Sequence, residues 1–134
     1  MPNSDYVVTS EDEILRRIKL PPPDRNENDL IKILPDGKKE ITRVAFRPHP
    51  ERDKDGLSVN IISLATDVAD LYNEQTHLAV KIIAQKCFDL DLDIIHDPLV
   101  DDKTNPGYSH ALMVDLMNQK NKQQKLAEDC EIIT

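Results

Sequence analysis

The chain has 134 residues, a length typical of one domain, and carries 25 acidic against 17 basic residues for a net charge of −8. Hydrophobic residues make up 39% and aromatic residues 4%, with no tryptophan, so an aliphatic core is expected. The acidic balance argues against nucleic acid as the partner, because a nucleic-acid binder needs a concentrated positive face. No secretory signal pattern and no apolar run of 18 residues occurs, so we expect a cytoplasmic protein without a membrane partner.

A helix is predicted from Ser10 to about residue 20. Ser10 and Glu13 have the spacing of a capping box, and the residues that follow place an apolar stripe at helical intervals: Ile14, Leu15 and Ile18. The three prolines at 21–23 end this helix. Residues 29–46 then predict a β-hairpin, because two alternating runs flank the turn sequence Pro35-Asp36-Gly37.

Residues 57–63 form a β-branched run that predicts a strand, after a charged loop. Helical spacing follows, with a short face at 66–72 and a second helix at 76–88 that Thr76 caps. Two further strands are predicted at 91–96 and 110–116, and a polar helix in the tail. We therefore expect a single α+β domain over 1–134, with a small, mostly antiparallel sheet and a helical layer on one face. Residues 1–9 and about 118–134 are expected to be peripheral.

The two cysteines, Cys87 and Cys130, have neither the spacing of a metal site nor that of a redox motif. Cys87 lies in an apolar run and is expected to be a buried thiol. A reducing compartment is consistent with this cysteine usage.

Two histidines stand at the inner ends of the last two predicted strands. His96 and His110 are separated by a 13-residue loop, so antiparallel pairing would bring them to the same end of the sheet. Asp97 follows His96 directly, and we take His96, Asp97 and His110 as candidate catalytic residues. Two imidazoles and a carboxylate could act as acid and base or bind a divalent metal, although imidazoles at strand ends also commonly make structural hydrogen bonds.

Four further residues are candidates for substrate binding. Asn105 and Tyr108 lie in the loop between the two histidines, and Arg47 and His49 lie in the charged loop before residue 57. That charged loop has only one glycine, so it is not a phosphate cradle and is more simply a solvated connection. His77 is expected to have no role. No nucleophile or nucleotide-binding motif occurs, and no cofactor is predicted beyond the open possibility of a metal.

Two blocks of the sequence, "DKDGLSVNI" and "HDPLVDDKTNPGYSHALMV", resemble short bacterial proteins of uncharacterised function. Those proteins share a D-G-L-S-V strand start and the blocks H-D-P-L, N-P and H-A-L. The chain departs from them by extra loop residues at 100–104 and by Tyr108 and Ser109 before the second histidine. The resemblance implies a bacterial or phage cytoplasmic setting and no particular activity.

Two functions are consistent with these patterns. The leading hypothesis is a small acidic protein-interaction or accessory protein of a bacterial or phage operon, because of the negative charge, the size and the lack of a catalytic motif. The alternative is a small enzyme or ligand-binding domain that acts on a nucleotide-like substrate at His96, Asp97 and His110. Nucleic-acid binding through the Lys/Gln-rich tail ranks below both. A protein partner is expected, and the oligomeric state is not predicted.

Overall fold

The computed structural model describes residues 6–21 and 29–133. The strands are β1 (Glu13–Lys19), β2 (Ile31–Ile33), β3 (Lys39–Ile41), β4 (Leu57–Ile61), β5 (His77–Ile83), β6 (Asp93–His96), β7 (His110–Val114) and β8 (Glu131–Ile132). The α-helices are α1 (Ala84–Phe88) and α2 (Lys120–Asp129). Short 3-10 helices are η1 (Arg43–Phe46), η2 (Ile62–Leu64), η3 (Val68–Leu71) and η4 (Pro106–Ser109).

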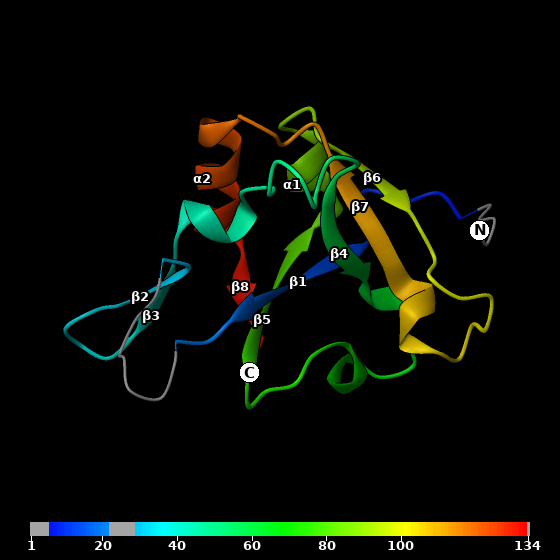
Figure 1. Cartoon of the computed structure of the whole chain (residues 1–134), viewed down its shortest axis with the longest axis horizontal. Coiled ribbons are helices and arrows are strands. Elements are labelled where there is room, and N and C mark those ends of the chain that lie inside the picture. Colours follow the sequence, from blue (N-terminus) through cyan, green and yellow to red (C-terminus); the bar gives the residue numbers. More distant parts are fainter. Residues whose placement is uncertain (1–5, 22–28, 134) are drawn as a thin grey trace.

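Six of these strands form one sheet in the order β6-β7-β4-β1-β5-β8, and β2 and β3 form a separate hairpin. Every strand pairing within the described ranges is antiparallel. Figure 1 shows the hairpin to one side of the large sheet and the two α-helices above it. The predicted α+β class and the mostly antiparallel sheet are confirmed.

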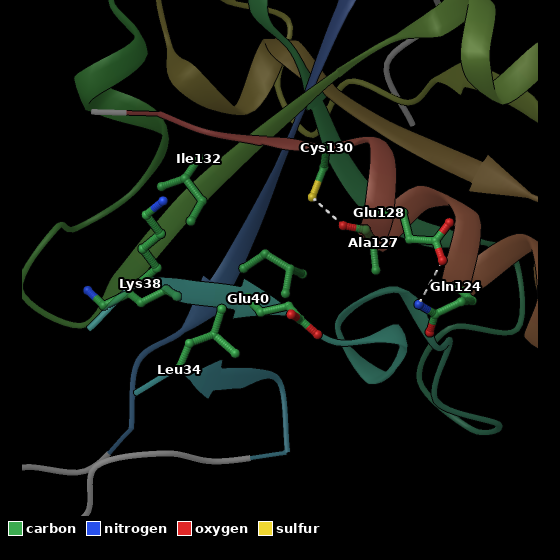
Figure 2. Close-up of a pocket in the computed structure, with 10 residues that line it drawn as sticks. Leu34, Lys38, Glu40, Gln124, Ala127, Glu128, Cys130 and Ile132 are labelled. Atoms are coloured by element: carbon green, nitrogen blue, oxygen red, sulfur yellow. Dashed lines mark hydrogen bonds between the residues drawn. The ribbon is translucent and has the colours of Figure 1, made fainter. Parts of the chain in front are cut away.

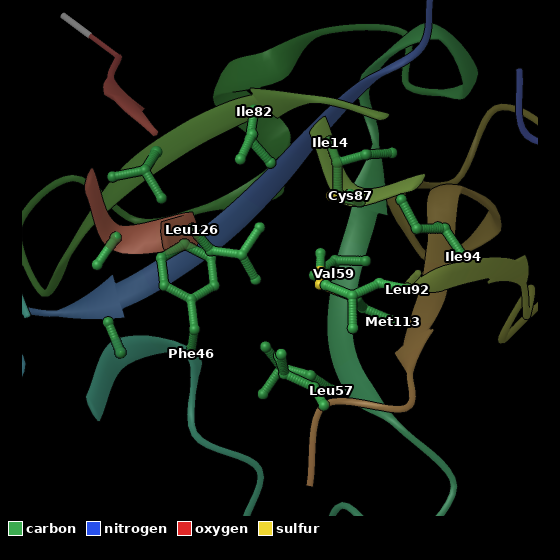
Figure 3. Packing of buried hydrophobic residues seen from close by; sticks show 14 of the residues in the cluster. Ile14, Phe46, Leu57, Val59, Ile82, Cys87, Leu92, Ile94, Met113 and Leu126 are labelled. Atoms are coloured by element: carbon green, nitrogen blue, oxygen red, sulfur yellow. The ribbon is translucent and has the colours of Figure 1, made fainter. Parts of the chain in front are cut away.

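The main core lies on one side of the large sheet, called here the core face. Figure 3 shows Phe46 of η1 and Leu126 of α2 pointing toward the strands from this side. Alternate residues of the strands point back at them, since successive side chains of a strand face opposite ways. The strand residues of this cluster include Ile14, Ile18, Leu57, Val59, Ile61, Leu78, Val80, Ile82, Ile94, Ala111 and Met113. The helical layer is thus on one face, as predicted.

The opposite side, called here the second face, has a smaller apolar cluster. Leu15 of β1 and Ala79 of β5 pack there against Leu71 of η3. The chain from η2 to η3 covers this part of the face, and beside it lie the polar side chains of Arg17, Ser58, Asn60 and His110. The candidate functional site lies among these polar side chains.

The predicted helix at 10–20 is wrong, because these residues form strand β1. Ile14 and Ile18 point to the core face and Leu15 to the second face, so a central strand buried on both sides explains the apolar pattern. β1 lies between β4 and β5, where a continuous ladder of hydrogen bonds outweighs a local helical preference. The same applies to 76–88, which is strand β5 followed by the short helix α1.

The C-terminal tail differs from the peripheral segment expected from its polarity. It contains the expected helix, but Gln123 and Leu126 of α2 are 1% and 0% exposed, and Leu126 belongs to the main core. Strand β8 then pairs with β5 at the edge of the sheet. In the expected N-terminal periphery, Val8 also joins the core, while residues 1–5 lie outside the described residues. No helix in the described ranges is long and apolar enough to cross a bilayer.

A buried carboxylate fixes the chain just before β1. Asp12 is 8% exposed and accepts hydrogen bonds from the Tyr6 hydroxyl at 2.8 and 2.9 Å, from Thr9 N at 2.8 Å and from Ser63 Oγ at 3.1 Å. Burial alone would raise the pKa of Asp12, but the hydrogen bonds from Thr9, Tyr6 and Ser63 together outweigh it and lower the pKa below its usual value. Asp12 therefore connects the start of the sheet to η2.

We predict that Asp12→Asn lowers the free energy of unfolding at pH 7 by about 1–3 kcal/mol, because the charged acceptor of several hydrogen bonds is lost. The depressed pKa means that the stabilisation is complete above the unfolded-state pKa of about 4 and is lost as pH falls through the folded-state pKa. Urea unfolding at pH 7 and at pH 3 measures this. The two proteins should differ at pH 7 and the difference should narrow at pH 3, while Glu11→Gln, a change at an exposed neighbour, should behave like the wild type.

Candidate functional site

The two histidines predicted to share a site point to opposite faces of the sheet. The pairing of β6 with β7 sets His96 directly opposite Ala111, which belongs to the core face, and so turns His110 to the second face. His96 is 7% exposed, and its Nε2 lies 2.6 Å from the carbonyl oxygen of Tyr108. The rings of Tyr6 and Tyr108 contact it edge-on, with centroids 5.7 and 5.0 Å away. The structure therefore does not bring His96 and His110 together, and His96 anchors the loop that follows it.

His110 is instead the centre of a different constellation. Its Nε2 lies 2.6 Å from the Ser58 hydroxyl, and its Nδ1 lies 2.9 Å from the backbone oxygen and 3.3 Å from the carboxylate Oδ2 of Asp97. The side chain of His110 is 13% exposed and that of Asp97 is 34% exposed. The order of groups is serine, imidazole and carboxylate, which is the order in which a serine nucleophile is activated.

The partners of His110 decide which of its nitrogens carries the proton. Both Asp97 oxygens near Nδ1 can only accept hydrogen bonds, so Nδ1 is the donor in the neutral imidazole. Nε2 then presents a lone pair, and the Ser58 hydroxyl donates to it. This is the tautomer that a general base needs in order to take a proton from serine.

Strand geometry places Ser58 within reach of His110. β4 alternates between buried apolar residues on the core face and polar residues on the second face, and the polar ones are Ser58 and Asn60. Asn60 lies directly opposite His110 in the β4–β7 pairing, and Ser58 is the diagonal neighbour. Gly56, just before β4, has a φ of +144°, and a Cβ there would lie 3.0 Å from Leu112 Cβ and 3.1 Å from Met113 O. A glycine is therefore needed where β4 begins beside β7.

Buried hydrogen bonds hold this arrangement in place. Arg16 donates from Nη1 to the backbone oxygen of Ser58 at 2.8 Å and from Nε to Ala45 O at 3.2 Å. Ser109 Oγ lies 3.1 Å from Asn60 Oδ1, which leaves the Asn60 amide nitrogen as the donor end of that side chain. The serine and the asparagine are thus fixed on the rigid sheet and not on a loop.

Ser58 and His110 open into a cavity of about 180 Å³ on the second face. Asn60 and Arg17 share its floor, and its walls come from η3 and from the loop after β6. The wall residues are Asp70, Leu71, Leu99, Pro106 and Gly107. The cavity can take a small group directly beside the serine hydroxyl.

The other predicted substrate-binding residues do not line this cavity. Asn105 is exposed and its side chain accepts from Gly107 N, while Tyr108 contacts His96 through its ring. His49 accepts from the backbone nitrogens of Glu51 and Arg52, which makes it part of its own loop. Arg47 lines a separate cavity between that loop and the start of α2. Of the seven predicted site residues, only Asp97 and His110 belong to the group of side chains around Ser58, while His96 and Tyr108 contact each other elsewhere.

A larger groove of about 470 Å³ lies between the β2–β3 hairpin and α2, away from His110. Figure 2 shows that its lining combines Leu34 and Ile132 with charged side chains such as Lys38, Glu40 and Glu128. Its one nucleophilic group, Cys130, has a pKa raised to about 11 by burial, so its thiol is not ionised at neutral pH. The groove has no base beside that thiol and does not form a second reactive centre.

Within the described ranges, no group of three or more His, Cys, Asp or Glu side chains is arranged to hold a metal ion. Comparison with protein-family models, with curated proteins and with solved structures found no match to this chain. The site must therefore be interpreted from its own chemistry.

Sequence reasoning missed Ser58, Asn60 and Arg17. Ser58 has Gly56 at the first glycine position of the G-x-S-x-G motif, but Asn60 stands where the second glycine would be, and Ser58 lies 52 positions from His110 in the chain. A signal was nevertheless present, because "LSVNI" puts two polar side chains on one face of an otherwise apolar strand. Such a pattern indicates a polar site on that face once the neighbouring strand is known.

Proposed function

We propose that the protein is a small serine hydrolase that cleaves an ester with Ser58 as the nucleophile and His110 as the general base and acid. The observation that carries the proposal is the contact of 2.6 Å between Ser58 Oγ and His110 Nε2, with Asp97 on the other side of the imidazole, at the floor of a cavity. Hydrogen bonds of this kind give a hydroxyl the nucleophilicity that it lacks in water.

The chemistry follows from the tautomer. His110 Nε2 takes the hydroxyl proton as Ser58 Oγ forms a bond to the ester carbonyl carbon, and the carbonyl π electrons move onto its oxygen. The tetrahedral intermediate collapses, the bond to the leaving alkoxide breaks, and the proton on Nε2 passes to that oxygen. Water, deprotonated by the same nitrogen, then attacks the acyl-serine and releases the acid while the proton returns to Ser58.

The developing oxyanion needs hydrogen-bond donors beside the serine. The amide nitrogen of Asn60 and the guanidinium of Arg17 are the donors that line the same cavity. Asp97 is a positioning residue, since it touches His110 and not the ester: it fixes the Nδ1–H tautomer and balances the imidazolium that forms.

The proposal takes up the enzyme alternative predicted from the sequence, with Ser58 in place of His96. Ser58, Asp97 and His110 also fall within the D-G-L-S-V, H-D-P-L and H-A-L blocks by which the chain resembles short bacterial proteins. A cytoplasmic location and a protein partner stay predictions from the sequence. The two free thiols, Cys87 and Cys130, are consistent with a reducing compartment.

Hydrolysis of p-nitrophenyl acetate tests the proposal, and Asp97→Asn gives a graded prediction. The backbone oxygen of Asp97 is closer to Nδ1 than its carboxylate is, so the tautomer survives loss of the carboxylate charge. We therefore expect Asp97→Asn to lower kcat/KM by about tenfold, far less than the roughly 10⁴-fold loss seen where the carboxylate alone fixes the imidazole.

Asp102→Asn is the matched control, because Asp102 lies in the same loop but its side chain hydrogen-bonds only to Thr104 among the described residues. It should leave kcat/KM unchanged. Wild-type protein should show saturable hydrolysis that His110→Ala lacks. A wild-type rate no higher than that of His110→Ala would contradict the proposed function.

A further inference from the structure

A second cavity, of about 290 Å³, adjoins the first on the second face of the sheet, and the two share Arg17, Ser58 and Asn60. We call this second cavity the basic channel. Among the residues that the structure describes, those that line it are Arg16, Arg17, Lys19, Leu30, Arg52, Ser58, Asn60 and His77. Arg17, Lys19 and Arg52 contribute cationic side chains, His77 contributes an imidazole, and no described lining residue is acidic. Arg16 alternates onto the core face with Ile14 and Ile18 and donates to the backbone oxygens of Ala45 and Ser58.

This concentration of positive charge runs against the balance of the whole chain, which has a net charge of −8. Neither Arg17 nor Arg52 has an ion pair with a carboxylate among the described residues. Burial lowers the pKa of Arg16 to about 10; Asp53 opposes that shift, and Arg17 and Arg52 add to it. Burial, Arg17 and Lys19 also lower the pKa of His77. Arg17 and Arg52 therefore bring two like charges to one cavity, and a bound anion would offset them.

We propose that the substrate carries a phosphate group that binds in the basic channel while its ester lies against Ser58. The inference rests on the proposed hydrolase function and names the substrate class of that site. Guanidinium groups hold phosphate oxygens through paired hydrogen bonds, and the channel supplies Arg17 on one side and Arg52 on another.

The two cavities differ in a way that fixes the orientation of such a substrate. The smaller one is walled by Leu71, Leu99 and Pro106 and includes the carboxylate of Asp70 as well as Arg17, so it suits a small acyl group better than a phosphate dianion. The basic channel has the opposite character. Ser58 lies where they meet, so the scissile bond of a phosphorylated ester with a short acyl group would lie at its hydroxyl.

Part of this channel comes from the charged loop at 46–56, which the sequence did not indicate as a phosphate site. That loop does not cradle an anion with glycine nitrogens; it contributes the single side chain of Arg52. The other cations come from strand β1, whose central place in the sheet was not predicted. The channel thus exists only when the loop and the strand are brought together by the fold.

Calorimetric titration of the full-length protein with inorganic pyrophosphate tests the inference. Wild-type protein should bind it saturably, and Arg17→Gln/Arg52→Gln should bind it at least about tenfold more weakly, since two charge-assisted contacts are removed. Both arginines are exposed, so the double variant should fold. Lys86→Gln, which removes an exposed cation from α1 outside the channel, is the matched control and should bind like the wild type.

The outcomes separate this inference from the proposed function. His110→Ala should bind pyrophosphate as the wild type does, because His110 lines only the smaller cavity. Saturable binding of pyrophosphate without any ester hydrolysis would support phosphate binding in the basic channel and contradict the proposed hydrolase function. Two results would contradict phosphate binding in the basic channel: wild-type protein that hydrolyses the ester but binds no pyrophosphate, or a double variant Arg17→Gln/Arg52→Gln that binds pyrophosphate as tightly as the wild type. Neither result would contradict the hydrolase function.

Discussion

Ser58→Ala should hydrolyse p-nitrophenyl acetate at least about 10³-fold more slowly than the wild type, because the bond-forming atom is removed. The residual rate should come from binding and from the donors of the cavity, Asn60 and Arg17. Steady-state kinetics with the two proteins at matched concentration measure the effect. The loss should appear in kcat, since Ser58 contributes little to holding the substrate before reaction.

Ser63→Ala is the matched control for this change. Ser63 is an exposed serine on η2 that hydrogen-bonds to Asp12 and does not line either cavity of the second face. It should leave kcat unchanged. A Ser58→Ala protein that keeps more than about a tenth of the wild-type kcat would assign the activity to another group.

Leu126→Ala should lower the free energy of unfolding by about 2–5 kcal/mol, as expected when a fully buried leucine is truncated and a cavity remains. Leu126 is 0% exposed and packs in the main core on the same side as Phe46. The change tests whether the C-terminal helix is part of the core, as the structure shows, or a solvated appendage, as its composition indicated. Urea unfolding monitored by circular dichroism measures it.

Gln124→Ala, on the exposed side of the same helix, is the control. Its expected effect is within about 0.5 kcal/mol, because surface substitutions away from special contacts change little. If Leu126→Ala were as stable as Gln124→Ala, the packing of α2 against the sheet would be contradicted.

The fold could be predicted where the pattern is local and strictly alternating. "LSVNI" gives strand β4 because its apolar side chains recur at every second position, and β6 follows from Leu92, Ile94 and His96 at the same spacing. β1 could not be recognised this way. Ile14, Leu15 and Ile18 match a helical stripe and match equally a strand buried on both faces, and only its pairing with β4 and β5 decides between them.

The site was predictable in its region but not in its composition. The loop between β6 and β7 indicated a site at that edge, and Asp97 and His110 do meet there. The pairing register could not be predicted from spacing, and a register that sets His96 opposite Ala111 sends the two imidazoles to opposite faces. Ser58 enters the site through β4, whose place beside β7 is a contact between segments far apart in the chain.

The measurement that bears most directly on the account is covalent capture of the nucleophile. Wild-type protein treated with diisopropyl fluorophosphate should gain one diisopropylphosphoryl group with loss of fluoride, and peptide mass mapping should place it on Ser58. His110→Ala should not be labelled, because Ser58 Oγ then has no base at 2.6 Å. Absence of an adduct on the wild type, or an adduct on another residue that persists in His110→Ala, would contradict a serine nucleophile at this site.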